Sequence, residues 1–211
     1  MERKRVGILI FPQVEVLDFC GPFEVLAAVR LDESRRREQS SPFDVFLVAE
    51  RAEPVVANGG LRVLPDHTLA DCPPLDLLIV PGGWGVRREI NNKALIAWIA
   101  ERGQQVETLA SVCTGAMLLG RAGLLDGKHA TTHWDSLNWM RESFPNVTVE
   151  DQLRFVEDGY VITSAGISAG IDMALRLVAR YFGEDIARAT ARHMEYRYLE
   201  GNIIELQHWS K

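Results

Sequence analysis

The sequence has little cysteine and no excess of positive charge, and each shortage excludes a class of protein. Its 211 residues contain three cysteines, at positions 20, 72 and 113, and no Cys-x-x-Cys pair. We therefore expect neither a disulfide framework nor a metal site. Lysine and arginine number 23 against 29 aspartates and glutamates, a net charge of -6. This balance argues against nucleic acid as a partner.

Long apolar runs are also absent. No uninterrupted apolar run reaches the length that spans a bilayer, so no membrane partner is expected. The N-terminal Met1-Glu2-Arg3-Lys4-Arg5 leads directly into a strand-length apolar run and not into a signal-peptide region. We therefore expect a cytoplasmic protein. No repeat, low-complexity tract or linker interrupts the chain, which predicts a single domain over residues 1–211.

What the sequence does contain is an alternation of strand-like and helix-like segments. Strands are predicted at residues 5–11, 43–49, 75–80, 106–112 and 129–132, and hairpins at 55–64 and 155–163. Helices are predicted at residues 14–29, 91–102, 136–142, 168–182 and 184–198, with Pro22 expected as the first residue of a helix. This alternation predicts an α/β fold with a mostly parallel sheet and helices on both faces.

The segment Ser111-Val112-Cys113-Thr114-Gly115 follows a predicted strand and precedes an amphipathic helix. Small residues around a Cys at such a junction are typical of a nucleophile elbow, in which a sharp turn projects the reactive side chain. The N-terminus of the following helix favours the thiolate form of Cys113. The alternative is a buried structural cysteine, because free cysteines are among the most buried residues.

Other polar or small residues also follow predicted strands, and ligands bind at the carboxyl ends of the strands in such sheets. Asp18 follows the first strand, Gly82 and Gly83 a middle one, and His133 a later one. Asp18 is interpreted either as a helix N-cap or as a carboxyl in an apolar pocket, whose pKa would be raised for acid–base work.

The remaining candidates would surround the cysteine. Gly82 and Gly83, with the amide of Thr114, are expected to form an oxyanion-type hole, although a simple strand-ending turn explains the glycines equally well. His133 is either the catalytic partner of Cys113 in a Cys–His pair or a histidine with a structural role only. Histidines at such strand ends more often have the structural role. Trp84 and Trp134 follow candidate site residues and are expected to wall a substrate pocket.

These residues resemble those of the ThiJ/PfpI superfamily of class I glutamine-amidotransferase-like domains and, within it, the isonitrile hydratase (isocyanide hydratase) subgroup. The matching segments cover most of the chain in the family's order. They are residues 6–11, 17–25, 81–83, 111–116, 122–127, 130–134 and 166–172.

The resemblance implies a flavodoxin-like three-layer sandwich, a homodimer and a cysteine nucleophile that needs no cofactor. It places the family's carboxylate on Asp18. The residue after the nucleophile is Thr114, where peptidase-like members carry histidine, and this argues against peptidase activity. The implied reaction adds water to a small-molecule isonitrile through a covalent Cys113 thioimidate, giving an N-substituted formamide. In it the Thr114 hydroxyl orients Asp18, and the amides of Gly83 and Thr114 stabilise charge.

Two alternatives remain open. One is a glyoxalase-like or deglycase-like enzyme acting on 2-oxoaldehydes with the same cysteine. The other is a non-enzymatic sensor, in which Cys113 is oxidised or a small molecule binds. Similar patterns occur in the sensor domains of AraC-type transcription regulators. Those proteins continue into a helix-turn-helix region, for which we expect no room before Lys211.

Overall fold

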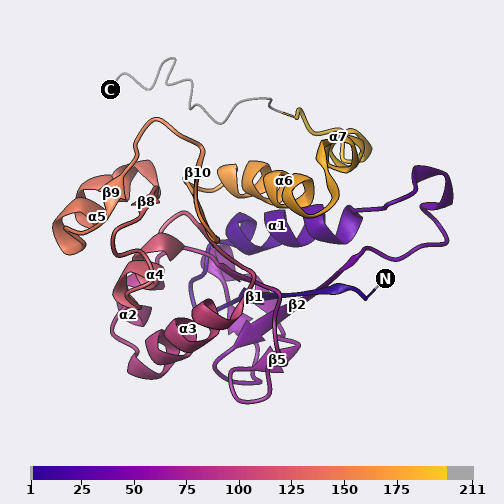
Figure 1. Ribbon diagram of the computed structural model, residues 1–211. Helices are drawn as coiled ribbons and strands as arrows, with labels where there is room; N and C mark the ends of the chain where they lie inside the picture. The colour runs from indigo at the N-terminus through magenta and orange to yellow at the C-terminus, as the bar shows by residue number, and fades with distance from the viewer. Residues whose placement is uncertain (1, 199–211) are drawn as a thin grey trace.

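A seven-stranded sheet lies at the centre of the structure, a computed structural model that describes residues 2–198 (Figure 1). The strand order is β10-β11-β7-β6-β1-β2-β5, and all neighbours run parallel except the β10–β11 hairpin. The strands are β1 (Lys4–Leu9), β2 (Phe43–Ala49), β5 (His67–Thr68), β6 (Leu77–Val80), β7 (Thr108–Val112), β10 (Phe155–Asp158) and β11 (Val161–Ser164). Two small pairs lie outside the sheet: β3 (Val55–Val56) with β4 (Arg62–Val63), and β8 (His129–Ala130) with β9 (Thr148–Val149).

Helices cover both faces of this sheet. One layer contains α1 (Val16–Ala28), α6 (Ala169–Phe182) and α7 (Glu184–His193), which pack against one another (Figure 1). The opposite side carries α2 (Val86–Glu89), α3 (Lys93–Gln105), α4 (Gly115–Arg121) and α5 (Leu137–Ser143). The flavodoxin-like three-layer sandwich predicted from the sequence is therefore confirmed.

The central strands are rich in apolar residues because neither face of the sheet meets water. Every residue of β6 and β7 is buried, and the side chains of Val6, Ile8 and Leu9 in β1 are fully covered. The edge strand β10 is only partly buried. The candidate site residues predicted from the sequence follow the carboxyl ends of three of these buried strands, β1, β6 and β7.

The helix containing Pro22 differs from the prediction. Pro22 lies inside α1 and does not begin it, since the helix starts at Val16. The apolar side of α1 packs closely on α6, and this packing outweighs the local cost of a proline inside a helix. One consequence concerns Asp18, which lies in the first turn of α1. Glu15 holds the N-cap position, so the interpretation of Asp18 as a helix cap is wrong.

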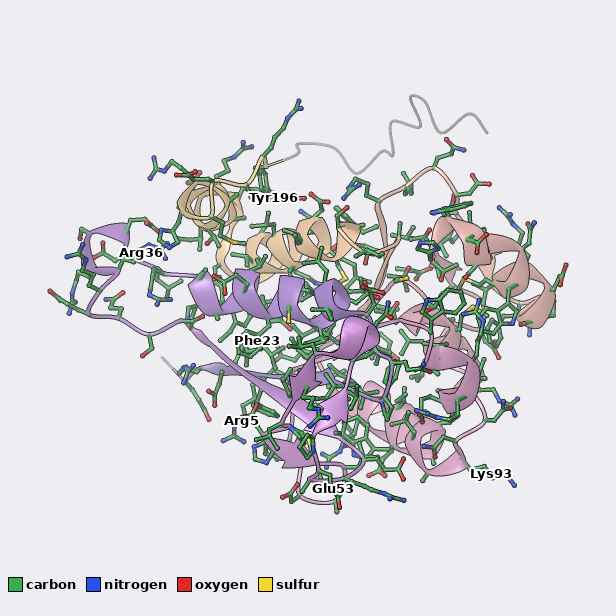
Figure 2. All side chains as sticks on the ribbon, turned by 180° about the vertical axis from the view of Figure 1, so that it is seen from behind. Arg5, Phe23, Arg36, Glu53, Lys93 and Tyr196 are labelled. Atoms are coloured by element: carbon green, nitrogen blue, oxygen red, sulfur yellow. The ribbon has the colours of Figure 1, made fainter. Side chains whose placement is uncertain are left out.

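Smaller differences occur at the ends of elements. The last predicted helix ends at His193, short of residue 198. The polar stretch around residues 31–42 is an excursion that carries Arg36 away from the body of the molecule (Figure 2).

The predicted single domain extends past the described residues at both ends. Within residues 2–198, no helix is long and apolar enough to cross a membrane.

Candidate active site

Cys113 lies on a sharp turn between β7 and α4. Its φ of 56° is in the left-handed region that residues with side chains rarely adopt, and its amide donates to the carbonyl of Ser164 at 3.1 Å. Gly115 makes the turn possible, because a Cβ there would lie 2.0 Å from the carbonyl oxygen of Val80. The strand–turn–helix geometry of a nucleophile elbow is therefore present, with a cysteine side chain that is 6% exposed.

The Asp18 carboxyl reaches the same point from α1. Its side chain is fully buried, its Oδ2 accepts a hydrogen bond of 3.0 Å from the Gly82 amide, and its Oδ1 has no partner among the described residues. Burial, and to a smaller degree the negative charge of Glu15, raises its pKa to about 8, although the Gly82 amide and the Cys113 side chain oppose this shift. Asp18 is therefore mostly protonated at neutral pH, and the predicted rise of its pKa is confirmed.

The Cys113 thiol faces Asp18 and three hydrogen-bond donors. Burial and the neighbouring carboxylate raise the pKa of the thiol, while the amides of Thr114 and Ile167 and the Thr114 hydroxyl partly counteract them. The Thr114 amide at the N-terminus of α4 favours the Cys113 thiolate, as expected, but it does not prevail, and the net pKa of the thiol is raised. Desolvation of the sulfur outweighs the donors around it. The site holds a thiol beside a protonated carboxyl.

The Gly82–Gly83 loop supports these groups from the end of β6. The Gly83 amide donates to the Thr114 hydroxyl oxygen at 3.0 Å, and the Gly82 amide is engaged by Asp18. The loop approaches so closely that a Cβ on Gly82 would lie 2.5 Å from the Thr114 nitrogen. Both amides are thus committed to side chains of the site, which corrects the expectation that Gly82 and Gly83 stabilise a substrate oxyanion.

The Thr114 hydroxyl also differs from expectation. It was expected to orient Asp18, but the hydrogen bonds of the described residues join it to the main chain of Gly83. The carboxyl of Asp18 is oriented by the Gly82 amide instead. Thr114 therefore acts on the loop and on the sulfur.

The amide of Ile167 is a site group that the sequence reasoning did not assign. It belongs to the turn between β11 and α6, and Ile167 has a φ of 32°. Residues 166–172 carried the family resemblance, but a main-chain donor leaves no chemical signature in the residue type. Only the tertiary structure brings this amide to Cys113.

His133 does not form a Cys–His pair in the contacts of the described residues. It caps the short 3-10 helix Trp134–Ser136, with its Nδ1 accepting from the Asp135 amide at 3.3 Å. Burial lowers its pKa, and Asp135 and Glu15 are the charges that act against this. Its ring packs on Gly166, where a Cβ would meet the ring carbon Cδ2 at 2.0 Å. The structural interpretation of His133 is therefore the one that the geometry favours.

The two tryptophans lie on the surface. Trp84 is 60% exposed and Trp134 is 71% exposed, so neither is a buried pocket wall. The Arg87 guanidinium lies 4.5 Å from the centre of the Trp84 ring and holds it by a cation–π contact.

No cluster of three or more potential metal ligands occurs among the described residues.

Comparison with known proteins places this geometry in a family. The sequence pattern of the DJ-1/PfpI family matches residues 4–180. The chain belongs to the DJ-1/PfpI family. Within it, the chain is 38% identical to an isonitrile hydratase from Pseudomonas putida over 192 residues, 91% of this chain and 78% of that protein.

Other relatives in the DJ-1/PfpI family have different names. The chain is 33% identical to the HTH-type transcriptional regulator CdhR of Pseudomonas aeruginosa over 179 residues, and spans 51% of that protein. A ThiJ/PfpI family structure from Pseudomonas syringae matches with a TM-score of 0.82 at 30% identity, over 93% of this chain and 76% of that one. The family accordingly includes enzymes and regulators.

Proposed function

We propose that the protein is an isonitrile hydratase-like enzyme that converts an isonitrile and water into an N-substituted formamide. The observation that carries the proposal is the buried Asp18 carboxyl, which interacts with the Cys113 side chain, is mostly protonated at neutral pH, and has an Oδ1 without a hydrogen-bond partner among the described residues. An isonitrile carbon must gain both a proton and a nucleophile. The similarity to the Pseudomonas putida isonitrile hydratase supports this choice of substrate class.

In the first half of the reaction, sulfur and hydrogen add to the terminal carbon of the isonitrile. Asp18 donates its proton to that carbon, and Cys113 forms a carbon–sulfur bond while its thiol proton passes to the Asp18 carboxylate. The product is a covalent thioimidate, and Asp18 is protonated again. This order suits a site in which the resting cysteine is a thiol, because the nucleophile is deprotonated only as it attacks.

In the second half, water replaces the sulfur. Asp18 protonates the thioimidate nitrogen and then accepts a proton from the water that attacks the carbon. The resulting adduct carries hydroxyl, amine and thioether groups on one carbon. The carbon–sulfur bond then breaks: Asp18, protonated by the attacking water, gives that proton to the leaving sulfur and accepts the hydroxyl proton, which releases the formamide and restores both the Cys113 thiol and the Asp18 carboxyl. The amides of Thr114 and Ile167 stabilise the sulfur as it leaves with negative charge.

The direct test is a substrate panel of an aryl isonitrile, an alkyl isonitrile and methylglyoxal. We expect formamide from at least one isonitrile with the wild type and with Cys20→Ala, and none with Cys113→Ala. Cys20 is the matched control because it is a free, half-buried cysteine on α1. Turnover of methylglyoxal without turnover of either isonitrile would overturn the proposal in favour of a glyoxalase-like enzyme.

The regulator relatives support a second candidate, a small-molecule sensor that uses the same residues, Cys113 and Asp18. A sensor would bind a ligand, or oxidise at Cys113 under mild peroxide, without turning over any substrate of the panel. Mass spectrometry of the Cys113 peptide beside the turnover assay separates the two. The raised pKa of the thiol argues against rapid oxidation, since the thiolate is the form that reacts.

We further propose that the protein acts in the cytoplasm as a homodimer. The support is the family membership and the exposed apolar side chain of Leu17, 37% exposed, which precedes Asp18 in α1. Light scattering at micromolar concentration should give about twice the 23.6 kDa of one chain. A mass near that of one chain would contradict the dimer.

A further inference from the structure

Residues 165–168 form a turn, here called the 165–168 turn, that joins the end of β11 to the start of α6. It lies against Cys113, because the Ala165 carbonyl accepts a hydrogen bond of 3.3 Å from the Cys113 amide, and its Ile167 amide is one of the donors that lower the pKa of the Cys113 thiol. Ile167 has positive φ, a conformation that persists only where the surroundings hold it. The structure must therefore fix this turn from outside.

Arg154 contacts both ends of the 165–168 turn. Its carbonyl accepts a hydrogen bond of 2.8 Å from the Ala165 amide, and its guanidinium Nη2 donates to the Ser168 hydroxyl oxygen at 3.3 Å. The Arg154 side chain is mostly buried and lies directly before β10, the strand that pairs with β11. The residue thus ties the two ends of the turn to one point of the sheet edge.

The guanidinium of Arg154 is itself held by Asp172 in the first turn of α6. Its Nε donates to the Asp172 carboxylate at 2.7 Å, and its Nη2 bonds to the same oxygen. The Tyr196 hydroxyl donates to the other carboxylate oxygen at 3.1 Å, and Tyr196 lies beside the C-terminal helices in Figure 2. Asp172 is only 7% exposed, so the pair has fixed geometry and little competition from water.

We propose that Arg154 is a positioning residue which, through Asp172 and Ser168, holds the Ile167 amide against the Cys113 sulfur. Arg154 does not touch the sulfur or a substrate. It acts through the turn. Because the turn holds the Ile167 amide in place, this donor stabilises the negative charge as it develops on the Cys113 sulfur. The inference rests on the proposed function only in taking Cys113 as the reacting group.

The test compares Arg154→Met, Arg154→Lys and a matched control, Arg176→Met. Arg176 is also an ion-paired arginine, bound to Glu157 at 2.9 Å and Glu184 at 3.3 Å, but it lies on α6 away from the turn. Each variant is labelled with iodoacetamide between pH 6 and 10, and alkylation of Cys113 is followed by peptide mass spectrometry. Thermal unfolding is measured in parallel.

Loss of the amide donor should raise the thiol pKa, and a rise of one unit leaves about ten-fold less thiolate. Because a more basic thiolate is also more nucleophilic, the net effect is a labelling rate lowered about three-fold at each pH below that pKa. We expect this decrease in Arg154→Met, a smaller one in Arg154→Lys, which keeps the charge but not the forked geometry, and none in Arg176→Met.

Labelling of Arg154→Met at the wild-type rate or faster would overturn the inference, even if its melting temperature falls. If that variant does not fold, Arg154→Lys and Ser168→Ala decide by the same measurement, and wild-type rates in both would overturn it. The assay needs no isonitrile. If the wild type shows no hydratase activity but Arg154→Met is labelled more slowly than the wild type, only the proposed function is rejected. If the wild type is active and Arg154→Met is labelled at the wild-type rate, only the role of Arg154 is rejected.

Discussion

Two buried aspartates lie in the first turns of neighbouring helices, Asp18 in α1 and Asp172 in α6, and their surroundings are opposite. Asp172 meets the guanidinium of Arg154 and the hydroxyl of Tyr196. Asp18 meets one main-chain amide and keeps one oxygen without a partner in the described part of the chain. The ion pair and hydrogen bond of Asp172 fix structure, whereas burial raises the pKa of the Asp18 carboxyl, so that it keeps its proton and is available for chemistry. The same residue type, in the first turn of a helix in both cases, thus serves two purposes.

The largest expected effect is on turnover in Asp18→Asn. The change keeps the shape of the side chain but removes the proton that Asp18 donates and accepts, so isonitrile turnover should fall about 10²-fold or more. The melting temperature should stay the same or rise, because no ion pair is lost. Steady-state kinetics and thermal unfolding check both. Full activity would remove Asp18 from the mechanism and end the contrast with Asp172.

Asp172→Asn should show the reverse. It leaves the mostly buried guanidinium of Arg154 without its counter-charge, which should lower the free energy of unfolding by about 3 kcal/mol. Urea unfolding measures this change. The turnover of the folded variant should fall much less than that of Asp18→Asn. A stability equal to wild type would show that the ion pair does not hold α6 to the sheet edge.

The third prediction is that the stability of Asp18→Asn relative to wild type depends on pH. The ordinary pKa of the carboxyl is 3.8, and in the folded protein it is about 8. Between these values the folded protein keeps a proton that the unfolded chain has lost, so wild-type stability falls as pH rises from about 4 to 8. The slope is at most about 1.4 kcal/mol per pH unit.

Asp18→Asn lacks this titration, so it should gain stability relative to wild type over that pH range. Melting temperatures of both proteins at pH 5, 6, 7 and 8 measure the difference, and groups common to both cancel. Parallel curves would mean that Asp18 is ionised in the folded protein. Activity should in turn decline above about pH 8, as the carboxyl loses its proton.

The smallest effect is expected for His133→Ala. The ring caps a short helix and packs on Gly166, and no hydrogen bond within residues 2–198 joins it to the sulfur, so turnover should fall less than about ten-fold. The pH dependence of Cys113 alkylation should stay close to wild type. An upward shift of that profile by more than about one unit, roughly 1.4 kcal/mol, would place His133 in the catalytic set.

Much of this arrangement follows from the sequence. The strands predicted at residues 43–49 and 75–80 end in the apolar runs 45–49 and 77–80, which indicate buried parallel strands because only a sheet covered on both faces tolerates them. The small residues around Cys113 predict the elbow, because a Cβ at Gly115 would collide with Val80. Asp18 is a visible candidate as an acidic residue in an apolar segment. Its position was predictable; its partners were not.

The tertiary structure alone decided which hydrogen-bond donors of the site bind side chains and which face the Cys113 sulfur. The amides of Gly82 and Gly83 bind side chains of the site, and the donors that face the sulfur are the amides of Thr114 and Ile167 and the Thr114 hydroxyl. Amides are the same in every residue except proline, so residue types cannot show which of them point at an atom distant in the chain. Burial decided the protonation states in the same way. The helix N-terminus expected to favour a thiolate is a local feature, and the desolvation that outweighs it depends on how the elements pack around the sulfur.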